Sequence, residues 1–536
     1  MHAPEPSDYA AFSTSALINP FEFDTNVTPG TRHHALLNTN EIPEGSEIPF
    51  ILSVVSETDS RLASLDDAIS KLRAQLEPLE KARASLLSYR TQNNAILSPL
   101  RKMPPELLGE IFSWTLPSFS DELDRRQSNL AESPWVLTHV SSSWRAVAHS
   151  TPSLWSRVLV NYDASASSSP YPLSLVEAQI QRSQKLMIHF RGCEEADSQP
   201  QIMMFRLLSQ YSSRWEELGV RLTPQLAPLL ADLRDRVPSL KRLWIDWTSP
   251  ESQTAAQPVD CFQTAGSLVD VGMYNEFHYI PVSLPLHQLT RYEIDAPWDK
   301  HVSFLTLATN LVEVRIDVDF VGDSSNAWAY GTVELLHLRR LYVSDPRVLG
   351  CLQLPVLEEL ALRIVEEDIV VQTLESFVSR SACPLRSFCL EISPSDVPTM
   401  VEILQKLSTI TQLIIMILYL SDTDRMNTLL STLTVSKFAE GTAVAPQLSS
   451  LIIGYEDDNC VDCVVYFEMV KSRWRAQNCA LKSATLLTKG PCLDPDTFRG
   501  LHELRDEGLD FFLVEGADAR TQMIRWTCST PWTVIT

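Results

Sequence analysis

Few residues of this chain stand at a spacing that could support catalysis or bind a metal. Cys460 and Cys463 form a C-x-x-C pair, a spacing found in redox and zinc sites. A zinc site needs a second pair or suitably spaced histidines, and the sequence supplies neither. Arg32, His33 and His34 lie together in a polar stretch with no partner motif nearby. We therefore predict no catalytic residue, no metal site and no cofactor.

The motifs of common enzyme families are also absent from the sequence. It has no G-x-x-x-x-G-K-[ST] for phosphate binding, no G-x-S-x-G around a nucleophile and no H-E-x-x-H for zinc. We therefore expect a protein that binds other proteins and is not an enzyme.

Charge and apolar content limit the classes of partner. The chain has 536 residues, with 44 Lys and Arg against 67 Asp and Glu, and its formal net charge is −23. This charge argues against nucleic acid and membrane partners, because phosphate binding needs clustered Lys and Arg. No apolar run is long enough to span a membrane, no secretory signal opens the chain, and the ten cysteines have no disulfide-framework spacing. We expect a cytoplasmic and/or nuclear protein.

The stretch Met103–Val160 carries the strongest interaction pattern. Two prolines and a glutamate at residues 104–106 favour a helix start. Apolar residues then follow at helical spacing in three short segments: Leu107, Leu108, Ile111 and Phe112; Val136, Val140, Trp144 and Val147; and Leu154 and Trp155. Three helices this short cannot bury so many apolar side chains among themselves, so we expect part of them to form a partner surface.

The blocks PPELLGEIF, VSSSWR and STPSLW within residues 97–160 resemble the F-box. In particular, they resemble the F-box-like proteins with C-terminal leucine-rich repeats that are abundant in mushroom-forming (basidiomycete) fungi. The chain departs from the family pattern at Ser141, where many members have cysteine, and at Ser118–Ser133, which is longer than the usual link. The resemblance implies docking on the Skp adaptor of a cullin-RING ubiquitin ligase. The contacts that it implies are Pro104, Pro105, Leu107, Leu108, Ile111, Phe112, Val140, Trp144 and Trp155.

Two regions precede this stretch. Residues 1–50 are rich in Pro, Ser, Thr and Asn and lack periodicity, which predicts a disordered tail. Residues 51–96 repeat leucine and isoleucine at the a and d positions of a heptad, and Pro78 inside them is expected to kink or split the helix. Two alternatives stay open for this helix: a homodimeric coiled coil, and an amphipathic helix or antiparallel hairpin that folds back on the F-box.

Units of the form L-x-x-L-x-L fill most of the chain after a loop or hinge at residues 161–172. They begin at Leu240, Leu268, Leu289, Leu311, Leu338, Leu357, Leu385, Ile410 and Leu448, with degenerate copies at Trp215 and Leu481. Intervals of roughly 20 to 28 residues are typical of leucine-rich repeats. We expect residues 173–490 to form a solenoid with parallel strands on its concave face, and residues 491–536 an irregular or capping segment. The expected fold class is α/β overall, with an N-terminal helical region before the solenoid.

Two columns of side chains would line the concave face, because strand residues alternate between the two faces of a sheet. One column alternates in charge through Arg242, Asp270, Arg291, Glu313, Arg340 and Glu359, which predicts a self-paired ladder. The next column becomes apolar along the array and has two alternatives. Either the segment after Leu487 folds over it, or an unknown protein substrate docks on Trp244, Arg315, Tyr342, Ile414, Met416 and Ile452.

These features lead to one expected function and one alternative. The resemblance implies a substrate-recognition subunit of a Skp-cullin-F-box type ubiquitin ligase, which binds the adaptor through the F-box and a substrate through the solenoid. Such a subunit acts by proximity, because it raises the local concentration of the substrate. The alternative is a non-catalytic repeat scaffold whose F-box-like helices mediate self-association or a ligase-independent interaction.

Overall fold

The chain divides after Pro104 into a helical first unit, Met1–Pro104, and a larger second unit, Pro105–Thr536. The computed structural model describes residues 26–116, 134–162, 172–255, 258–275, 278–318, 331–363, 367–392, 397–417, 423–435, 444–455, 461–476, 481–490, 493–516, 518–519 and 522–523. The predictions made for residues 1–25, for most of the loop at 161–172, for Cys460 and for residues 524–536 lie outside this part.

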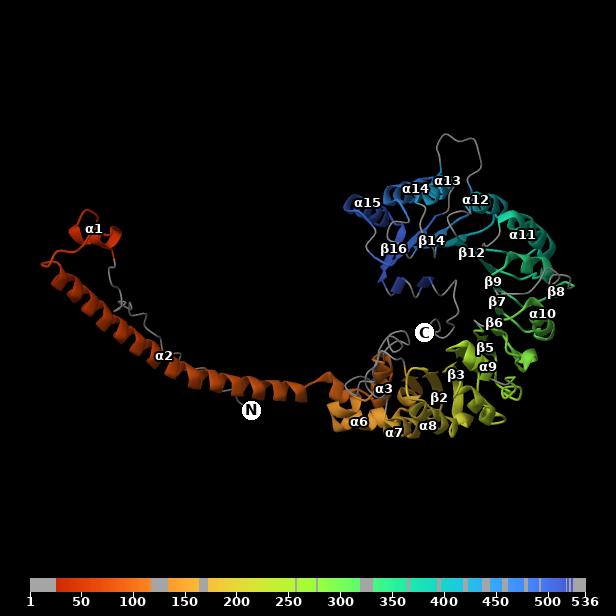
Figure 1. Ribbon diagram of the computed structural model, residues 1–536, viewed down its shortest axis with the longest axis horizontal. Helices are drawn as coiled ribbons and strands as arrows, with labels where there is room; N and C mark the ends of the chain where they lie inside the picture. The colour runs from red at the N-terminus through yellow and green to blue at the C-terminus, as the bar shows by residue number, and fades with distance from the viewer. Residues whose placement is uncertain are drawn as a thin grey trace, which may run out of the picture. The chain divides into compact units, whose positions relative to one another are not determined.

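Three helical segments form the described part of the first unit: α1 (Arg32–Asn38), α2 (Ile48–Ile96) and the 3-10 helix η1 (Pro99–Lys102), red to orange in Figure 1. Thr31 caps α1 by accepting a hydrogen bond from the backbone N–H of His34 at 3.2 Å. Arg32 forms ion pairs with Glu41 and Glu47. The disorder predicted for residues 1–50 is therefore wrong for residues 32–38 and 48–50, where a cap and local ion pairs accompany helix.

Helix α2 is 49 residues long and passes through Pro78 without a break. Proline removes one backbone hydrogen bond from a helix, and this helix tolerates the loss. Ion pairs between residues four positions apart support it, Glu57–Arg61 at 2.8 Å and Asp67–Lys71 at 2.5 Å. The predicted split and the predicted antiparallel hairpin are therefore wrong.

The second unit opens with short helices: α3 (Pro105–Trp114), α5 (Leu137–Val140), α6 (Ser142–Ser150) and the 3-10 helix η2 (Pro152–Trp155). Helix α3 begins at Pro105, whose ring fixes φ and whose missing N–H is not needed in a first turn. Helix α6 is capped by Ser141, which accepts a hydrogen bond from the backbone N–H of Trp144 at 3.1 Å.

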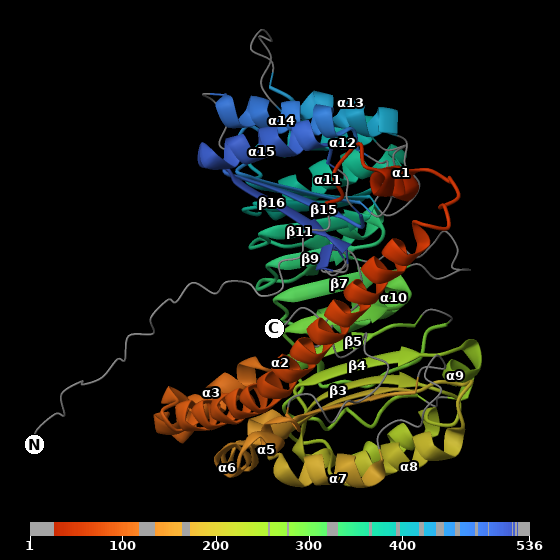
Figure 2. The same cartoon turned by 90° about the vertical axis from the view of Figure 1, so that its left-hand side faces the viewer.

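A sheet of 14 parallel strands follows, with the strands side by side in chain order, as Figure 2 shows for many of them. The strands are β1 (Arg157–Asn161), β2 (Leu186–Arg191), β3 (Trp215–Leu222), β4 (Arg242–Trp247), β5 (Asp270–Met273), β6 (Arg291–Asp295), β7 (Glu313–Asp317), β9 (Arg340–Val343), β11 (Glu359–Arg363), β12 (Ser387–Ile392), β13 (Gln412–Ile417), β14 (Ser450–Tyr455), β15 (Ser483–Thr488) and β16 (Asp510–Glu515). Strands β8 (Val333–Glu334) and β10 (Leu352–Gln353) pair with each other separately.

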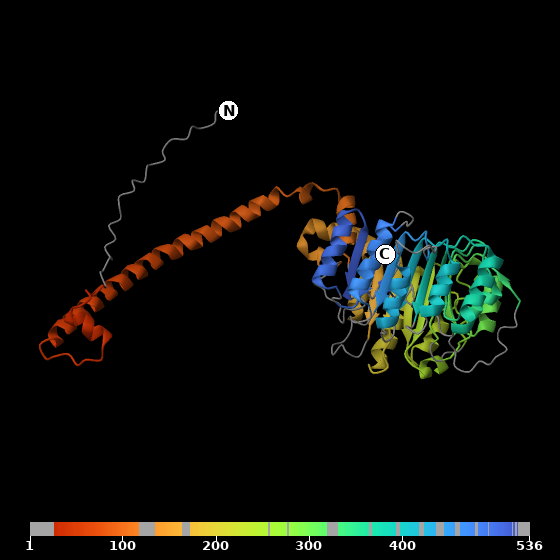
Figure 3. The same cartoon turned by 90° about the horizontal axis from the view of Figure 1, so that it is seen from above.

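Helical segments make most of the crossovers that parallel strands require. They are α7 (Leu173–Arg182), α8 (Ser198–Ser209), η3 (Ser212–Arg214), η4 (Ala227–Leu233), α9 (Pro250–Ala255), η5 (Leu286–Gln288), α10 (Trp298–Leu307), η6 (Pro346–Cys351), α11 (Glu367–Ser381), α12 (Val397–Lys406), α13 (Thr423–Leu433), α14 (Cys463–Arg475) and α15 (Pro495–Asp506). Within the second unit, helices α10 to α15 lie on the outer face of the sheet (Figures 1 and 3). We call the opposite face of the sheet the inner face.

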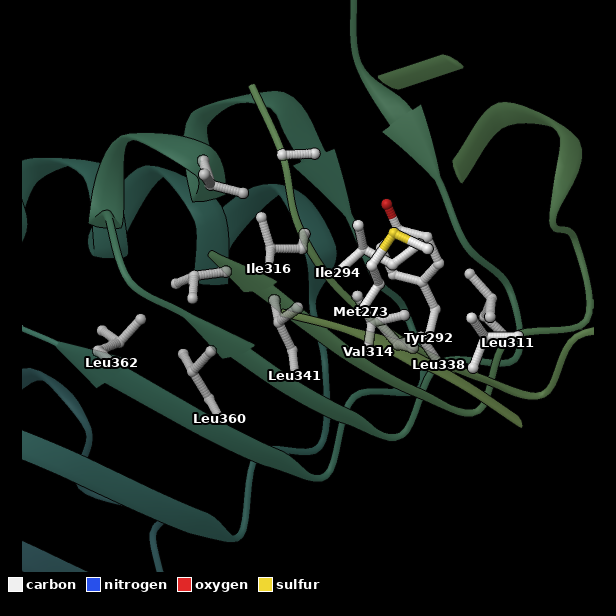
Figure 4. Packing of buried hydrophobic residues seen from close by; sticks show 14 of the residues in the cluster. Met273, Tyr292, Ile294, Leu311, Val314, Ile316, Leu338, Leu341, Leu360 and Leu362 are labelled. Atoms are coloured by element: carbon white, nitrogen blue, oxygen red, sulfur yellow. The ribbon is translucent and has the colours of Figure 1, made fainter. Parts of the chain in front are cut away.

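The core lies between the strands and these helices. The paired apolar residues of each L-x-L unit face into it and are buried, as Figure 4 shows for Tyr292 and Ile294, Val314 and Ile316, and Leu360 and Leu362. Burying one such side chain contributes about 1.5–3 kcal/mol. The register predicted from the L-x-x-L-x-L pattern is confirmed in strands β3 to β15.

The sheet extends beyond the predicted repeats at both ends. Strand β1 begins within residues 97–160 and ends at Asn161, and α15 and β16 lie within residues 491–536, which the sequence predicts to be an irregular or capping segment. Strand β16 aligns Phe511 and Leu513 with the apolar pair of β15. The first position of the L-x-x-L-x-L pattern is a large residue in the other units, but in this unit it is Gly508, with φ +108°. The pattern in the sequence therefore does not reveal this unit.

Candidate protein-interaction surfaces

Aromatic residues form the centre of the short helices α3 to η2. Phe112 and Trp155 are fully buried, and the centroids of the Phe112 and Trp144 rings are 4.8 Å apart. The indole N–H of Trp155 donates a hydrogen bond to the carbonyl of Ala148 at 2.8 Å. The guanidinium of Arg182, at the end of α7, lies 4.6 Å from the centre of the Trp155 ring. These contacts hold the short helices together and join them to α7.

One face of α3 stays exposed although it is apolar. Leu107 is 56% exposed, Ile111 is 42% exposed and Trp114 is 87% exposed. These residues are spaced by four and three positions, so they lie on the same side of the helix. Val140 on α5 is 56% exposed as well. Trp114 is not among the predicted contacts, although its position one turn after Ile111 could have indicated it.

The predicted adaptor contacts therefore fall into two groups. The exposed ones are Pro104, Pro105, Leu107, Ile111 and Val140. The others are the buried Leu108, Phe112 and Trp155 and the partly buried Trp144. The buried residues position the helices, and the exposed residues are available to a partner.

The charge column predicted for the inner face forms a ladder. The strand register aligns Arg242, Asp270, Arg291, Glu313, Arg340 and Glu359 on adjacent strands. Arg291 lies 3.6 Å from Asp270 and 3.2 Å from Glu313. Burial raises the pKa of Asp270 to about 6, although Arg291 acts to lower it. The predicted self-pairing is confirmed from Asp270 to Glu359, whereas Arg242 forms an ion pair with Glu217 of β3.

An open hollow of about 580 Å³ lies where strands β3 to β7 begin. It is lined by Glu216, Lys241, Arg242, Val269, Asp270, Thr290, Arg291, Val312 and Glu313. Four residues of the ladder, Arg242, Asp270, Arg291 and Glu313, thus line this hollow.

Arg315 and Tyr342, two of the predicted substrate contacts, belong to an ionic network on the inner face. Arg315 Nη1 lies 3.1 Å from Glu293 Oε1, and its guanidinium lies 4.6 Å from the centre of the Tyr342 ring. The Tyr342 hydroxyl donates to a carboxylate oxygen of Glu391 at 3.3 Å. Burial acts to lower the pKa of Arg315, but Glu293 and other nearby acidic groups raise it above its ordinary value. Both side chains therefore hold the strands together.

The apolar end of the inner face is covered by the chain itself. Ile414 and Met416 on β13 have no exposed surface, and they cluster with the buried Ala519 and Met523. A Cβ atom on residue Gly454 would lie 2.8 Å from the Met523 side chain, so glycine is needed for this close approach. The alternative in which Ile414 and Met416 form an open patch is therefore wrong. The other alternative, in which the segment after Leu487 folds over them, is the one that the structure has. An exposed apolar surface is unfavourable in water.

The two remaining predicted substrate contacts are partly buried. Ile452 on β14 packs against the covered cluster. Trp244 on β4 lies beside Gly272 of the next strand and within the part of the face that carries the charge ladder.

The described residues contain no group of three His, Cys, Asp or Glu side chains that could hold a metal ion. Cys463 is the first residue of α14 and is partly buried. In the same part of the chain, no helix combines the length and the apolar character needed to cross a bilayer.

Comparison with known proteins gives no match to this chain among protein-family models or among curated proteins. Its function is therefore proposed from its sequence patterns and from the geometry of these surfaces.

Proposed function

We propose that this protein is the substrate-recognition subunit of a Skp-cullin-F-box type ubiquitin ligase. The observation that supports this function best is the exposed apolar face of Leu107, Ile111 and Trp114 on α3, beside Val140 on α5. Large apolar side chains at helical spacing are typical anchors of a helix that docks on a partner. Leu107, Ile111 and Val140 also belong to the blocks that resemble the F-box, and this resemblance implies the Skp adaptor as the partner.

The aromatic residues beneath this face support the same function. Phe112, Trp144 and Trp155 pack under the exposed face, so the docking helices are held in place before a partner binds. Preorganisation of this kind lowers the entropic cost of association. Glu106 and Glu110 are exposed on α3 and would form a polar rim around the apolar anchors.

The long sheet is the proposed substrate-binding body, and we assign it to the leucine-rich-repeat solenoids. Parallel strands in chain order, each with an L-x-L pair in the core and a helical return on most crossovers, support this assignment. In such an array each repeat buries its apolar side against its neighbours. The opposite side is then available for binding.

The substrate is assigned to strands β3 to β9. The apolar end of the inner face is filled by Ala519 and Met523, whereas the charge ladder, the hollow and Trp244 lie at the other end. We therefore propose a substrate that presents charged groups, with Arg340, half of whose side chain is exposed, among its contacts. The subunit would act by bringing this substrate to the ligase, and it needs no catalytic residue of its own.

Co-expression of the full-length chain with the Skp adaptor of its source organism, followed by size-exclusion chromatography, tests the proposal. We expect a stoichiometric complex. The variant Leu107→Asp should weaken it at least tenfold, because a carboxylate would be desolvated in the interface. Leu107 is exposed in the free chain, so this variant should fold normally. Trp144→Ala is a less specific test, because it also removes packing on Phe112.

Leu336→Asp is the matched control, because Leu336 is a similarly exposed leucine outside α3 to η2. We expect it to bind the adaptor as the native chain does. Absence of a complex with the folded native chain would overturn the proposal and favour the scaffold alternative. Equal weakening by both variants would show that the loss is not specific to α3.

A further inference from the structure

Helix α2 carries a long apolar stripe that stays in contact with solvent. Leucines at three consecutive d positions, Leu72, Leu79 and Leu86, are 65% to 68% exposed. No described side chain of α2 is buried, although the helix is 49 residues long. A single helix in water obtains most of its stability from packing of such a face. The stripe therefore indicates a partner.

The stripe follows one heptad register, and three consecutive heptads, residues 62–82, have apolar residues at both the a and the d position. The a positions are Val55, Leu62, Ile69 and Leu76, and the d positions are Leu65, Leu72, Leu79 and Leu86. Pro78 falls at a c position, so the hydrogen bond that it removes lies away from the a/d seam. A regular a/d seam is complementary to a second helix with the same pattern.

We propose that α2 pairs with α2 of a second copy of this chain in a parallel, in-register coiled coil. The apolar stripe of each copy thus packs against the same stripe of the other copy. Val55 and Ile69 are β-branched residues at two of the four apolar a positions, and every d position from Leu65 to Leu86 is leucine. This combination favours two parallel strands over higher oligomers.

Arg83 occupies the a position that follows Leu76, near the end of the stripe. In a parallel pair, the two Arg83 side chains meet near that end and can extend into solvent. The parallel pair therefore accommodates Arg83, and the residues at the other a and d positions favour its orientation.

Charge at the flanking positions agrees with the same register. Arg61 is a g residue, and Asp66 is the e residue that follows it. In a parallel pair, Arg61 of one copy lies beside Asp66 of the other. Arg61 also pairs with Glu57 of its own helix at 2.8 Å, so it lies within an acidic surrounding in either state.

A parallel pair brings two recognition units together. Residues 97–104 connect α2 to the second unit, so both second units would leave the coiled coil at the same end. Two substrate-binding faces on one particle increase the effective affinity for a substrate with two binding segments. This consequence rests on the proposed function, whereas the dimer does not.

The mass of the full-length chain in solution, measured by light scattering after size-exclusion chromatography without the adaptor, tests the pairing. We expect twice the mass of one chain at about 10 μM. Leu72→Asp should give the mass of one chain. Ala74→Asp should stay dimeric, because residue 74 is an f position on the outer side and the substitution adds the same charge to the same helix turn.

A monomeric native chain, a mass above two chains, or dissociation of both variants would overturn the pairing. Because the adaptor is absent, a failure of adaptor binding leaves this measurement unchanged. Thermal unfolding of the second unit should be the same in all three proteins, which shows that the variants remain folded.

A single cysteine tests the orientation. The first cysteine of the chain is Cys193, so Leu65→Cys adds the only thiol of the first unit. In a parallel pair, the two residues at position 65 face each other, and mild oxidation should crosslink the dimer completely. In an antiparallel pair that used the whole of Leu62–Leu86, they would lie roughly 27 Å apart along the axis, too far for a disulfide. A dimer with no more crosslinking than the oxidised native chain would overturn the parallel orientation.

Discussion

His301 is a titratable side chain held neutral in the core of the second unit. Its Nδ1 lies 2.9 Å from the hydroxyl of Tyr292 and its Nε2 lies 3.2 Å from the carbonyl of Asp317. A carbonyl can only accept, so Nε2 carries the proton and Nδ1 accepts from the tyrosine. Burial lowers the pKa of His301 to about 4, although the Asp317 carbonyl acts to raise it.

This depressed pKa predicts a loss of stability in mild acid. Between pH 6.5 and about 4, the unfolded chain binds a proton at His301 and the folded chain does not, so the free energy of unfolding decreases as the pH falls. The full pKa difference corresponds to about 3 kcal/mol. In His301→Gln, we expect a smaller change in the denaturant-derived free energy of unfolding between pH 7 and pH 4.5.

His287→Gln is the control, because His287 is exposed, and it should keep the native pH dependence. Asp270, whose pKa is raised by burial, stabilises the folded chain as the pH falls. Its effect is common to all three proteins, so the difference between them isolates His301. The same pH dependence in His301→Gln and the native chain would contradict the assignment.

At the scale of elements, the C-terminal segment after β16 covers apolar side chains on the inner face. Ala519 and Met523 cover β13 and its neighbours, and Gly454 on β14 allows the close approach. The cover replaces solvent over a patch that the L-x-x-L-x-L strands would otherwise leave open. Elements far apart in the sequence thus share one small apolar cluster.

Met523→Ala tests the contribution of this cover. The side chain is buried, so we expect the free energy of unfolding to fall by about 2 kcal/mol, the low end for a methionine truncation, because a terminal segment can shift to close the gap. Fluorescence of a dye that binds exposed apolar surface should increase. Gln522→Ala, next to it and exposed, should change neither quantity. Unchanged stability and dye binding in Met523→Ala would show that the segment does not cover the face in solution.

At the scale of the whole molecule, the two units should be independent in stability. No described residue of α2 is buried, and the boundary between the units falls at Pro104. We therefore expect a chain that lacks residues 1–96 to unfold at the same temperature as the second unit of the native chain, within about 2 °C. Calorimetry measures both transitions.

A longer deletion provides the contrast. Removal of residues 1–114 also removes α3 with its buried Leu108 and Phe112, and the transition of the second unit should move to lower temperature by several degrees. Equal transition temperatures for the two deletions would mean that α3 is not packed on the second unit.

The sequence by itself determined the repeating parts of this protein. The L-x-x-L-x-L pattern predicted which side chains are buried, and the same register predicted the charge ladder from Arg242 to Glu359. Both follow from strand geometry, since alternate residues face opposite sides and neighbouring strands lie close together. The heptad helix and the short helices were predictable for the same reason, because their periods are local.

Tertiary structure alone decided which of these residues are free to bind. The sequence predicted both Leu107 and Phe112 as adaptor contacts. Packing leaves Leu107 exposed and buries Phe112. The sequence could not place Ala519 and Met523 over Ile414, because that contact joins residues about a hundred positions apart and follows no period. Burial and long-range contacts depend on the fold of the whole chain, whereas a periodic pattern depends only on residues near one another in the sequence. The sequence by itself therefore determined the periodic elements but not which of their residues are buried.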